Sequence, residues 1–470
     1  MNPTSTSAVG STVHRWVVRA ALPAAALVGI GLSIWHAGQF EIRPTGEGTP
    51  FLLADPQPGH NDWPGWRGPL QQGVVESEFL PPPSESTGWT EVWRTPWAAI
   101  GRSGPCVWGD RVFATGFDPD RLAIVLACFH RVTGALKWQT AVETNPDRGL
   151  PADRQALATP ACDGERVFVP VMADGEMRMA AVFMDGRMAW TQTIGPAHTR
   201  QGIRTSPCVF GPLVIVAQDE DGRSLFPGQS GSYLAALHRQ TGELVYRISR
   251  PKGESAGIPV AAEIAGRPQL VLTGRNAIRS YNPASGQELW RCHWKVSRTE
   301  GSVAWDDEHI YAVSGTADGE LICIRADGDG DVTETHVVWR ERRPGQAALS
   351  PLVTQVGVLV LARDGQLTAV NRATGKLLWQ KRSLGTCSTP PWRVGTQGVC
   401  VITDEGTVAL LNAVRRGEVL WETSLGVPVG GPAAVSGGRL IVRTPGGLLM
   451  TGGSSRETLV QQPPTDQQPL

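Results

Sequence analysis

One acidic stretch has the residue types of a calcium site. Asp327, Asp329, Asp331 and Glu334 place carboxylates close together, and the first three alternate as in the first half of a calcium-binding loop. Such a loop also needs a bidentate Glu at its twelfth position, but the twelfth residue counted from Asp327 is Val338. We therefore interpret the stretch as a solvated hairpin turn and predict no metal site.

The nine histidines offer no zinc or catalytic arrangement. None lies four residues from another, and no spacing typical of a Ser-His-Asp hydrolase emerges. The sequence therefore predicts no catalytic residues.

Eight cysteines occur singly, with no two adjacent and no CxxC motif. Single cysteines inside apolar strands behave as small hydrophobic residues, so buried thiols are the expected state. If the chain is exported, disulfides are also possible, and Cys387 with Cys400 is the pair expected on neighbouring strands. The full set is Cys106, Cys128, Cys162, Cys208, Cys292, Cys323, Cys387 and Cys400.

The elements that would position any site come from an internal repeat. A turn rich in hydrogen-bond acceptors is followed by Gly, and a large aromatic residue comes four positions after that Gly. The Gly supplies the positive φ of a hairpin turn, which fixes the place of the aromatic on the next strand, facing between sheets. The copies are Gly134 with Trp138, Gly186 with Trp190, Gly242 with Tyr246, Gly286 with Trp290, Gly375 with Trp379 and Gly417 with Trp421.

A second phrase precedes each copy and consists of a small-residue step, usually Pro, a hydrophobic run, a turn and an alternating strand. Its anchors are separated by 39 to 55 residues, which is the spacing of propeller blades. The anchors are Pro105, Pro160, Pro207, Pro259, Val303, Pro351, Pro390 and Pro432.

Eight anchors and eight aromatic stations predict an all-β fold, an eight-bladed β-propeller with four-stranded antiparallel blades. The last anchor has no aromatic after it, and Trp93 precedes the first anchor. We therefore expect the strand at residues 92–95 to complete the sheet begun by residues 432–452 and so close the ring. The aromatic stations are Trp93, Trp138, Trp190, Tyr246, Trp290, Trp339, Trp379 and Trp421.

At these residues the chain resembles the PQQ-like β-propeller repeat proteins. AVNRATGKLLW, residues 369–379, follows their repeat, and DWPGWRGP, residues 62–69, is similar to the segment that precedes many such propellers. The resemblance covers about residues 60–452. It implies a fold shared by quinoprotein alcohol dehydrogenases and by the propeller lipoprotein of outer-membrane barrel assembly, so the fold alone does not choose the function.

The two branches of the resemblance imply different chemistry. The enzymatic branch implies PQQ, a bound Ca²⁺ and an Asp base, commonly with a disulfide between adjacent cysteines, and this chain has no adjacent cysteines. We therefore expect a non-catalytic binding or scaffolding module without cofactor, with a PQQ-dependent oxidoreductase as the alternative.

Aligning the repeats against one another gives one candidate binding site. The residue three positions before each anchor enters the innermost strand and should approach the mouth of the central channel. Arg102, Arg204 and Glu300 occupy three of these places, either as a ligand or partner site or as a rim salt bridge. The full set is Arg102, Leu157, Arg204, Ala256, Glu300, Ala348, Cys387 and Val429.

The N-terminus predicts export to the cell envelope. Residues 20–35 are uncharged and largely apolar and follow Arg15 and Arg19, the pattern of a membrane anchor or a secretory signal. We expect an inner-membrane anchor at 16–37 after a cytoplasmic segment at 1–15, then a linker at 38–61, a periplasmic propeller at 62–452 and a disordered tail at 453–470. A protein partner in the envelope and a monomeric propeller are expected. A formal net charge of -1 argues against nucleic acid.

Overall fold

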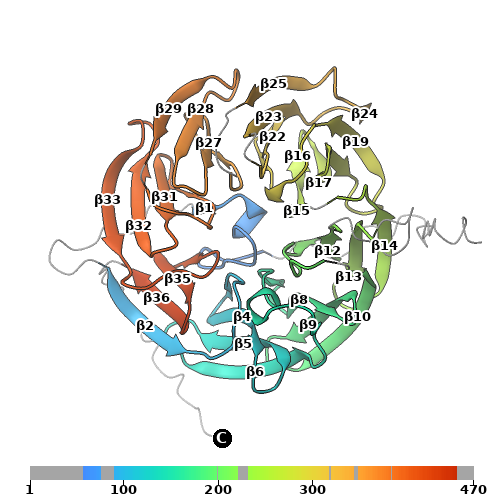
Figure 1. The fold of residues 1–470 in the computed structure, drawn as a ribbon, viewed down its shortest axis with the longest axis vertical. Coiled ribbons are helices and arrows are strands. Elements are labelled where there is room, and N and C mark those ends of the chain that lie inside the picture. Colours follow the sequence, from blue (N-terminus) through green and yellow to red (C-terminus); the bar gives the residue numbers. More distant parts are fainter. Residues whose placement is uncertain are drawn as a thin grey trace, which may run out of the picture.

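The chain forms a ring of eight β-sheets around a central channel (Figure 1). The computed structural model describes residues 57–75, 89–197, 199–220, 231–253, 255–316, 319–342, 348–382 and 384–452. Each blade is built on four antiparallel strands that follow one another from the channel outward, and two blades carry a fifth, parallel strand, which confirms the predicted all-β propeller of eight blades.

The blades are numbered in chain order. Blade 1 comprises β3 (Cys106–Trp108), β4 (Arg111–Asp118), β5 (Ala123–His130) and β6 (Leu136–Glu143), and blade 2 comprises β7 (Ala161–Cys162), β8 (Arg166–Ala173), β9 (Glu176–Phe183) and β10 (Met188–Pro196). Blade 3 comprises β11 (Cys208–Phe210), β12 (Leu213–Gln218), β13 (Tyr233–His238) and β14 (Leu244–Ser249), and blade 4 comprises β16 (Val260–Ile264), β17 (Arg267–Gly274), β18 (Ala277–Tyr281) and β19 (Glu288–His293). Blade 5 comprises β21 (Ala304–Trp305), β22 (His309–Val313), β23 (Glu320–Arg325) and β25 (Val337–Arg342), and blade 6 comprises β26 (Leu352–Val353), β27 (Val358–Leu361), β28 (Leu367–Val370) and β29 (Leu377–Lys381). Blade 7 comprises β30 (Trp392–Val394), β31 (Gly398–Ile402), β32 (Thr407–Asn412) and β33 (Glu418–Ser424), and blade 8 comprises β34 (Ala434–Ser436), β35 (Arg439–Thr444), β36 (Gly447–Gly452) and β2 (Thr90–Pro96).

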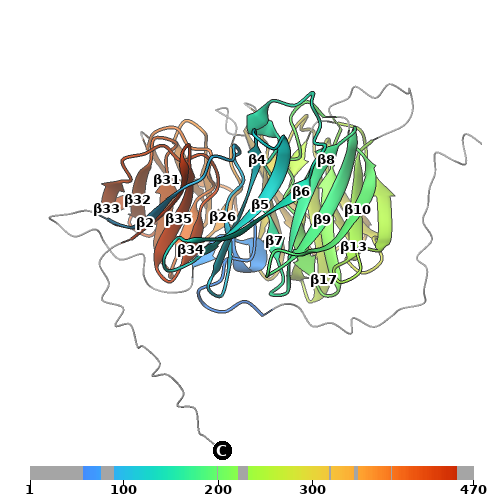
Figure 2. The same ribbon diagram turned by 90° about the horizontal axis from the view of Figure 1, so that it is seen from below.

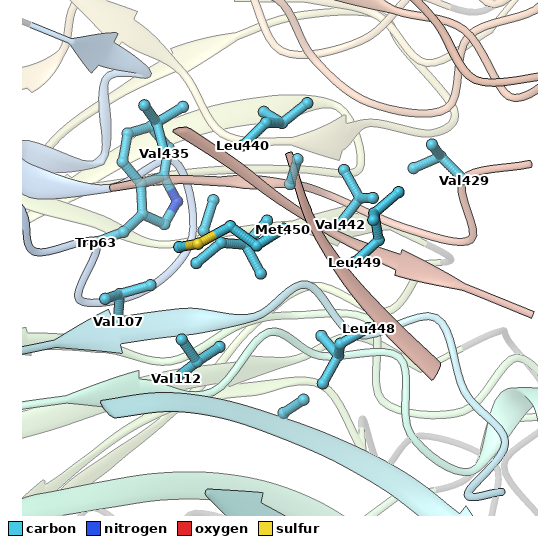
Figure 3. Close-up of a cluster of buried hydrophobic side chains, with 14 of the residues drawn as sticks. Trp63, Val107, Val112, Val429, Val435, Leu440, Val442, Leu448, Leu449 and Met450 are labelled. Atoms are coloured by element: carbon cyan, nitrogen blue, oxygen red, sulfur yellow. The ribbon is translucent and has the colours of Figure 1, made fainter. Parts of the chain in front are cut away.

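The ring closes as predicted, because β2 from the N-terminal part of the chain is the outer strand of blade 8. It pairs antiparallel with β36, with Trp93 opposite Met450. Figure 3 shows the apolar cluster at this closure, where Met450 of blade 8 lies near Val107 and Val112 of blade 1 and near Trp63. Strands distant in sequence thus bury a common core, and β2 covers the edge that β36 would otherwise leave open.

The repeated aromatics connect neighbouring blades. Trp138, on the outer strand of blade 1, donates from Nε1 to the carbonyl oxygen of Met184 at 3.1 Å and lies against Gly186, both in blade 2. The equivalent indole or phenol donates to a carbonyl of the next blade from Trp93, Trp190, Tyr246, Trp339 and Trp379. Two stations differ. Trp290 donates to Gln269 of its own blade at 2.8 Å, and Trp421 packs on Trp89 with ring centroids 5.0 Å apart.

The acidic stretch of blade 5 reaches across to blade 4. Within it, β24 (Gly330–Asp331) pairs in parallel with the outer strand β19, and Asp329 forms an ion pair with Arg267 at 3.1 Å. The stretch is exposed and lies between β23 and β25, as a solvated hairpin would. The sequence did not predict that it would add a fifth strand to its neighbour.

The segment at residues 57–75 closes the channel near one face of the ring, where Figures 1 and 2 show it in blue at the centre. It contains the short 3-10 helix η1 (Pro69–Gln71) and β1 (Val74–Val75), which pairs in parallel with β30 of blade 7. We call residues 59–75 the plug. It forms hydrogen bonds with seven of the blades, through Val107, Cys162, Pro259, Ser302, Pro351, Arg393 and Ser436.

Helical structure in the described residues is limited to η1 and the 3-10 helix η2 (Ala152–Arg154). Across that same part of the chain, we find no helix with the length and apolar character needed to cross a bilayer. The hydrophobic segment at 16–37 and the tail at 453–470 lie outside the described residues, so both stay predictions.

Candidate functional site

Hydroxyl groups at the strand entries connect adjacent blades around the channel. The backbone N–H of Gly104 donates to Thr159 Oγ1 at 3.2 Å, and the N–H of Thr159 donates to Ser206 Oγ at 3.0 Å. The N–H of Ser302 likewise donates to Ser350 Oγ at 2.9 Å. This contact was not predicted, although its signal is the Ser or Thr that directly precedes four of the anchor prolines: Pro160, Pro207, Pro351 and Pro390.

A two-stranded parallel ladder positions Glu300. β15 (Ala256–Gly257), at the entry to blade 4, pairs with β20 (Glu300–Gly301), at the entry to blade 5. Each strand also carries a glycine that packs closely against a neighbour outside the ladder. A Cβ on Gly257 would lie 2.4 Å from the Thr273 carbonyl oxygen, and one on Gly301 would lie 2.2 Å from Ser350 Oγ. The ladder therefore holds the Glu300 backbone at a fixed point beside the channel.

The Glu300 carboxylate lies among three arginines. Arg204 Nη1 is 3.3 Å from Glu300 Oε1, Arg363 Nη2 is 2.6 Å from Oε2, and Arg298 also pairs with Oε1. The Glu300 and Arg204 side chains are 12% and 22% exposed, whereas that of Arg363 is 42% exposed. We call these four residues the arginine cluster. It carries two positive charges in excess.

The structure brings together two of the three predicted site residues. Arg204 and Glu300 form an ion pair and line one pocket, but Arg102 is exposed and lies outside that pocket. Arg204 and Glu300 thus form a salt bridge, one of the two alternatives expected at these positions, and the parallel ladder holds the Glu300 backbone that carries this carboxylate. Arg298 and Arg363 were not predicted, since neither lies at the aligned strand entry.

Two opposing effects set the protonation of Glu300. Burial raises the pKa of this carboxyl, but the hydrogen bond from Arg363 and the charges of Arg363, Arg298 and Arg204 outweigh burial. The pKa of Glu300 therefore lies below its ordinary value, and the carboxylate stays ionised at neutral pH.

A pocket of about 140 Å³ lies between the arginine cluster and the plug. Trp66 of the plug lines it and donates from Nε1 to Ser302 Oγ at 3.3 Å. Of the aligned entry residues, Leu157, Arg204, Ala256 and Glu300 line this pocket. The remaining lining residues are Ser206, Ile258, Gly301, Leu349, Ser350, Arg363, Ser388 and Pro390.

These residues do not fit a bound quinone cofactor. The pocket is smaller than the roughly 300 to 1,000 Å³ typical of sites for drug-sized ligands and cofactors, because the plug occupies the channel beneath it. In the part of the chain that the structure describes, no group of three or more His, Cys, Asp or Glu side chains is arranged to hold a metal. We therefore derive no chemistry through PQQ or Ca²⁺.

All eight cysteines are buried thiols and none is paired in a disulfide. Cys400 lies on β31 opposite Trp392, whereas Cys387 precedes β30 and belongs to another apolar cluster. Burial raises the pKa of the Cys387 thiol to about 12. The thiols are therefore part of the packing.

The fold and site define a PQQ-like β-propeller of eight blades, with a plugged channel and a pocket bordered by ion pairs. Residues 84–271 and 274–412 match the model of the family described as "Outer membrane protein assembly factor BamB". The chain belongs to this family.

Individual relatives are distant. The chain is 24% identical to the outer membrane protein assembly factor BamB of Bordetella pertussis over 181 residues. This match covers 38% of this chain and 44% of the relative. The chain thus matches less than half the length of that protein.

Two solved structures share the fold. BamB from Moraxella catarrhalis is 16% identical with a TM-score of 0.56, covering 78% of this chain and 98% of that one. Quinohemoprotein alcohol dehydrogenase from Comamonas testosteroni is 13% identical with a TM-score of 0.62, covering 84% and 81%. Since the same fold occurs in an assembly factor and in an enzyme, the site must decide between these functions.

Proposed function

We propose that this chain is a non-catalytic docking module of the cell envelope, which binds a protein partner at its channel mouth. The family supports this role, because it is described as that of an outer membrane protein assembly factor. The observation that carries the proposal is the arginine cluster at the edge of a small pocket. Charged side chains of this kind give a docking surface its specificity and speed its encounter with a partner of opposite charge.

In this proposal residues 16–37 tether the propeller to the inner membrane, with the propeller in the periplasm. The positive charges of Arg15 and Arg19 would keep the preceding residues on the cytoplasmic side. Protease added to spheroplasts should digest or release the propeller, and membrane fractions should contain the full-length chain with the inner membrane. Full protection from protease, or co-fractionation with the outer membrane, would contradict the proposed topology.

Affinity capture tests the docking role. The full-length tagged protein and an Arg204→Ser/Arg363→Ser variant are used to capture partners from the envelope fraction of the parent cell, at low and moderate salt. The double variant has fewer hydrogen-bond donors and less positive charge than the parent protein. It should therefore capture the partner more weakly, and its capture should depend less on salt. Arg187→Ser is the matched control, because Arg187 is 74% exposed and pairs with Asp185 in blade 2.

The result is interpreted only for folded variants, so the melting temperature of each is measured first. Loss of one partner from the double variant, with the Arg187→Ser variant behaving as the parent does, is the expected result. An unchanged partner set from a folded double variant would place docking elsewhere on the propeller.

A further inference from the structure

The pocket can admit a chain end but cannot let a chain pass through. The plug forms hydrogen bonds with seven of the blades around the channel, and its residue Trp66 lines the pocket. A polypeptide that enters from the mouth must therefore end there, or turn back within a volume of about 140 Å³. That volume favours a chain end, because a returning loop would bring two backbone segments into the same space.

The wall of the pocket suits one apolar side chain. Leu157, Ile258, Leu349 and Pro390 line it together with the Trp66 indole. An apolar cavity of roughly 150 Å³ holds a benzene molecule, so this pocket is matched to a side chain of the size of Leu or Phe. A longer or charged side chain would exceed the space or lose its hydration there.

The mouth of the same pocket suits a carboxylate. Three guanidinium groups face one carboxylate, and the Arg363 side chain is 42% exposed at its position beside Glu300. Guanidinium groups bind carboxylates through paired hydrogen bonds, and the excess positive charge favours a second anion.

Two serine hydroxyls in the pocket also favour a ligand that carries a hydrogen-bond acceptor. Ser206 Oγ and Ser350 Oγ each accept a backbone N–H from a neighbouring blade, and both residues line the pocket. A hydroxyl that accepts one hydrogen bond still carries a proton to donate. The pocket thus combines donors and positive charge with an apolar wall.

We propose that the pocket binds the carboxyl-terminal residue of a partner polypeptide. Its apolar side chain fills the space above Trp66, and its terminal carboxylate lies at Arg204 and Arg363. An internal Asp or Glu fits less well, since it brings a carboxylate without an apolar group on the same residue. This inference rests on the proposed docking function and specifies the part of the partner that is recognised.

Calorimetric titration of the full-length protein with short peptides tests the proposal. The probes are acetyl-Gly-Ser-Gly-Ser-Leu with a free carboxylate, the same peptide as its C-terminal amide, and the free acid ending in Gly. We expect the Leu acid to bind, the amide to bind at least about tenfold more weakly because it lacks the charged acceptor, and the Gly acid also to bind more weakly. Equal binding of the Leu acid and its amide would overturn the proposal.

Variants separate recognition from folding. Arg363→Gln should weaken binding of the Leu acid while leaving the weak binding of the amide unchanged, and Arg363→Lys should restore part of the affinity through its charge. Arg187→Gln is the control that should bind as the parent does. Equal affinity of Arg363→Gln and parent protein for the Leu acid would contradict the assigned position of the carboxylate.

The outcome also separates this inference from the docking function. If no peptide binds but capture of the envelope partner still depends on Arg204 and Arg363, recognition of a chain terminus is wrong and docking at the mouth stands. If no peptide binds and capture is independent of both arginines, both proposals fail.

Discussion

Gly242 of blade 3 lies directly against the indole of Trp190 of blade 2, close enough that a Cβ on the glycine would come within 2.6 Å of Trp190 Cδ2. The same indole donates from Nε1 to the carbonyl oxygen of Arg239, at 3.2 Å. The Gly of one repeat thus contacts the aromatic of the preceding repeat. Within one copy, the glycine contacts the preceding blade and the aromatic contacts the next blade. The constant spacing of four residues sets the positions of both contacts.

Replacing Gly242 with Ala should destabilise the propeller more than the same change at Gly266. Both glycines have a positive φ, of 76° and 71°, but a Cβ at Gly266 would meet no atom within 4 Å. Gly266→Ala should therefore cost only the backbone strain, about 1 to 2 kcal/mol, and Gly242→Ala about 1 to 3 kcal/mol more through overpacking. Denaturant unfolding measures both variants. Equal costs would mean that the indole contact does not limit this position.

Variants of Trp379 should show how much one repeated aromatic contributes to the free energy of unfolding. Trp379 is buried, and its Nε1 donates to the Ala413 carbonyl oxygen of the next blade at 3.1 Å. Trp379→Ala should lower the free energy of unfolding by about 3 to 5 kcal/mol through the cavity it leaves. Trp379→Phe keeps a ring but removes the donor, so it should cost about 1 to 2 kcal/mol. If the Phe variant loses as much as the Ala variant, the hydrogen bond matters more than packing.

Stability should respond to acid through Glu300. The pKa of this carboxyl is lowered in the folded state, so its stabilising contribution is present above the ordinary Glu value of about 4.3 and is lost as pH falls through the folded pKa. The stability difference between the parent protein and Glu300→Gln should therefore be constant from neutral pH down to about 5 and shrink below about 4. Denaturant unfolding at several pH values gives this difference. A difference that shrinks between pH 8 and pH 6 would show that another group dominates.

The thiols should be unreactive in the folded protein. Burial raises the pKa of Cys128, Cys208 and Cys323 to about 12, so almost no thiolate is present at neutral pH and reagent access is blocked. A disulfide-exchange reagent should detect no thiol in the native protein and eight after unfolding without reductant. Six thiols after unfolding would indicate one disulfide, with Cys106 and Cys162 as the pair to examine first, because these two side chains contact each other.

The propeller could be predicted from the sequence because one signal recurs in almost every blade. A glycine and an aromatic four residues later, such as Gly186 and Trp190, mark the same turn and strand in each copy. No aromatic follows the last anchor, and this gap identified β2 as the closing strand. The partner of each aromatic could not be predicted in the same way, since Trp138 contacts a glycine of the next copy. That contact depends on how blades pack around the ring.

The candidate site was only partly predictable. Alignment of the strand entries identified Arg204 and Glu300, because equivalent positions in a propeller converge on its channel. It missed Arg363, which lies after β27 outside the aligned position, and Trp66, which lies in a segment that is not repeated. It also selected Arg102, whose entry is equivalent in sequence but lies outside the pocket.

Site-specific photocrosslinking in the parent cell tests docking at the channel mouth most directly. A photoreactive phenylalanine analogue replaces Ser388, which is exposed and lines the pocket, or Leu136, which is 50% exposed on the outer strand β6 of blade 1. The docking account predicts a crosslinked envelope protein from position 388 and none from position 136, with the crosslink lost when Arg204 and Arg363 are also replaced by Ser. A crosslink from position 136 alone, or one from position 388 that survives the loss of both arginines, would contradict it.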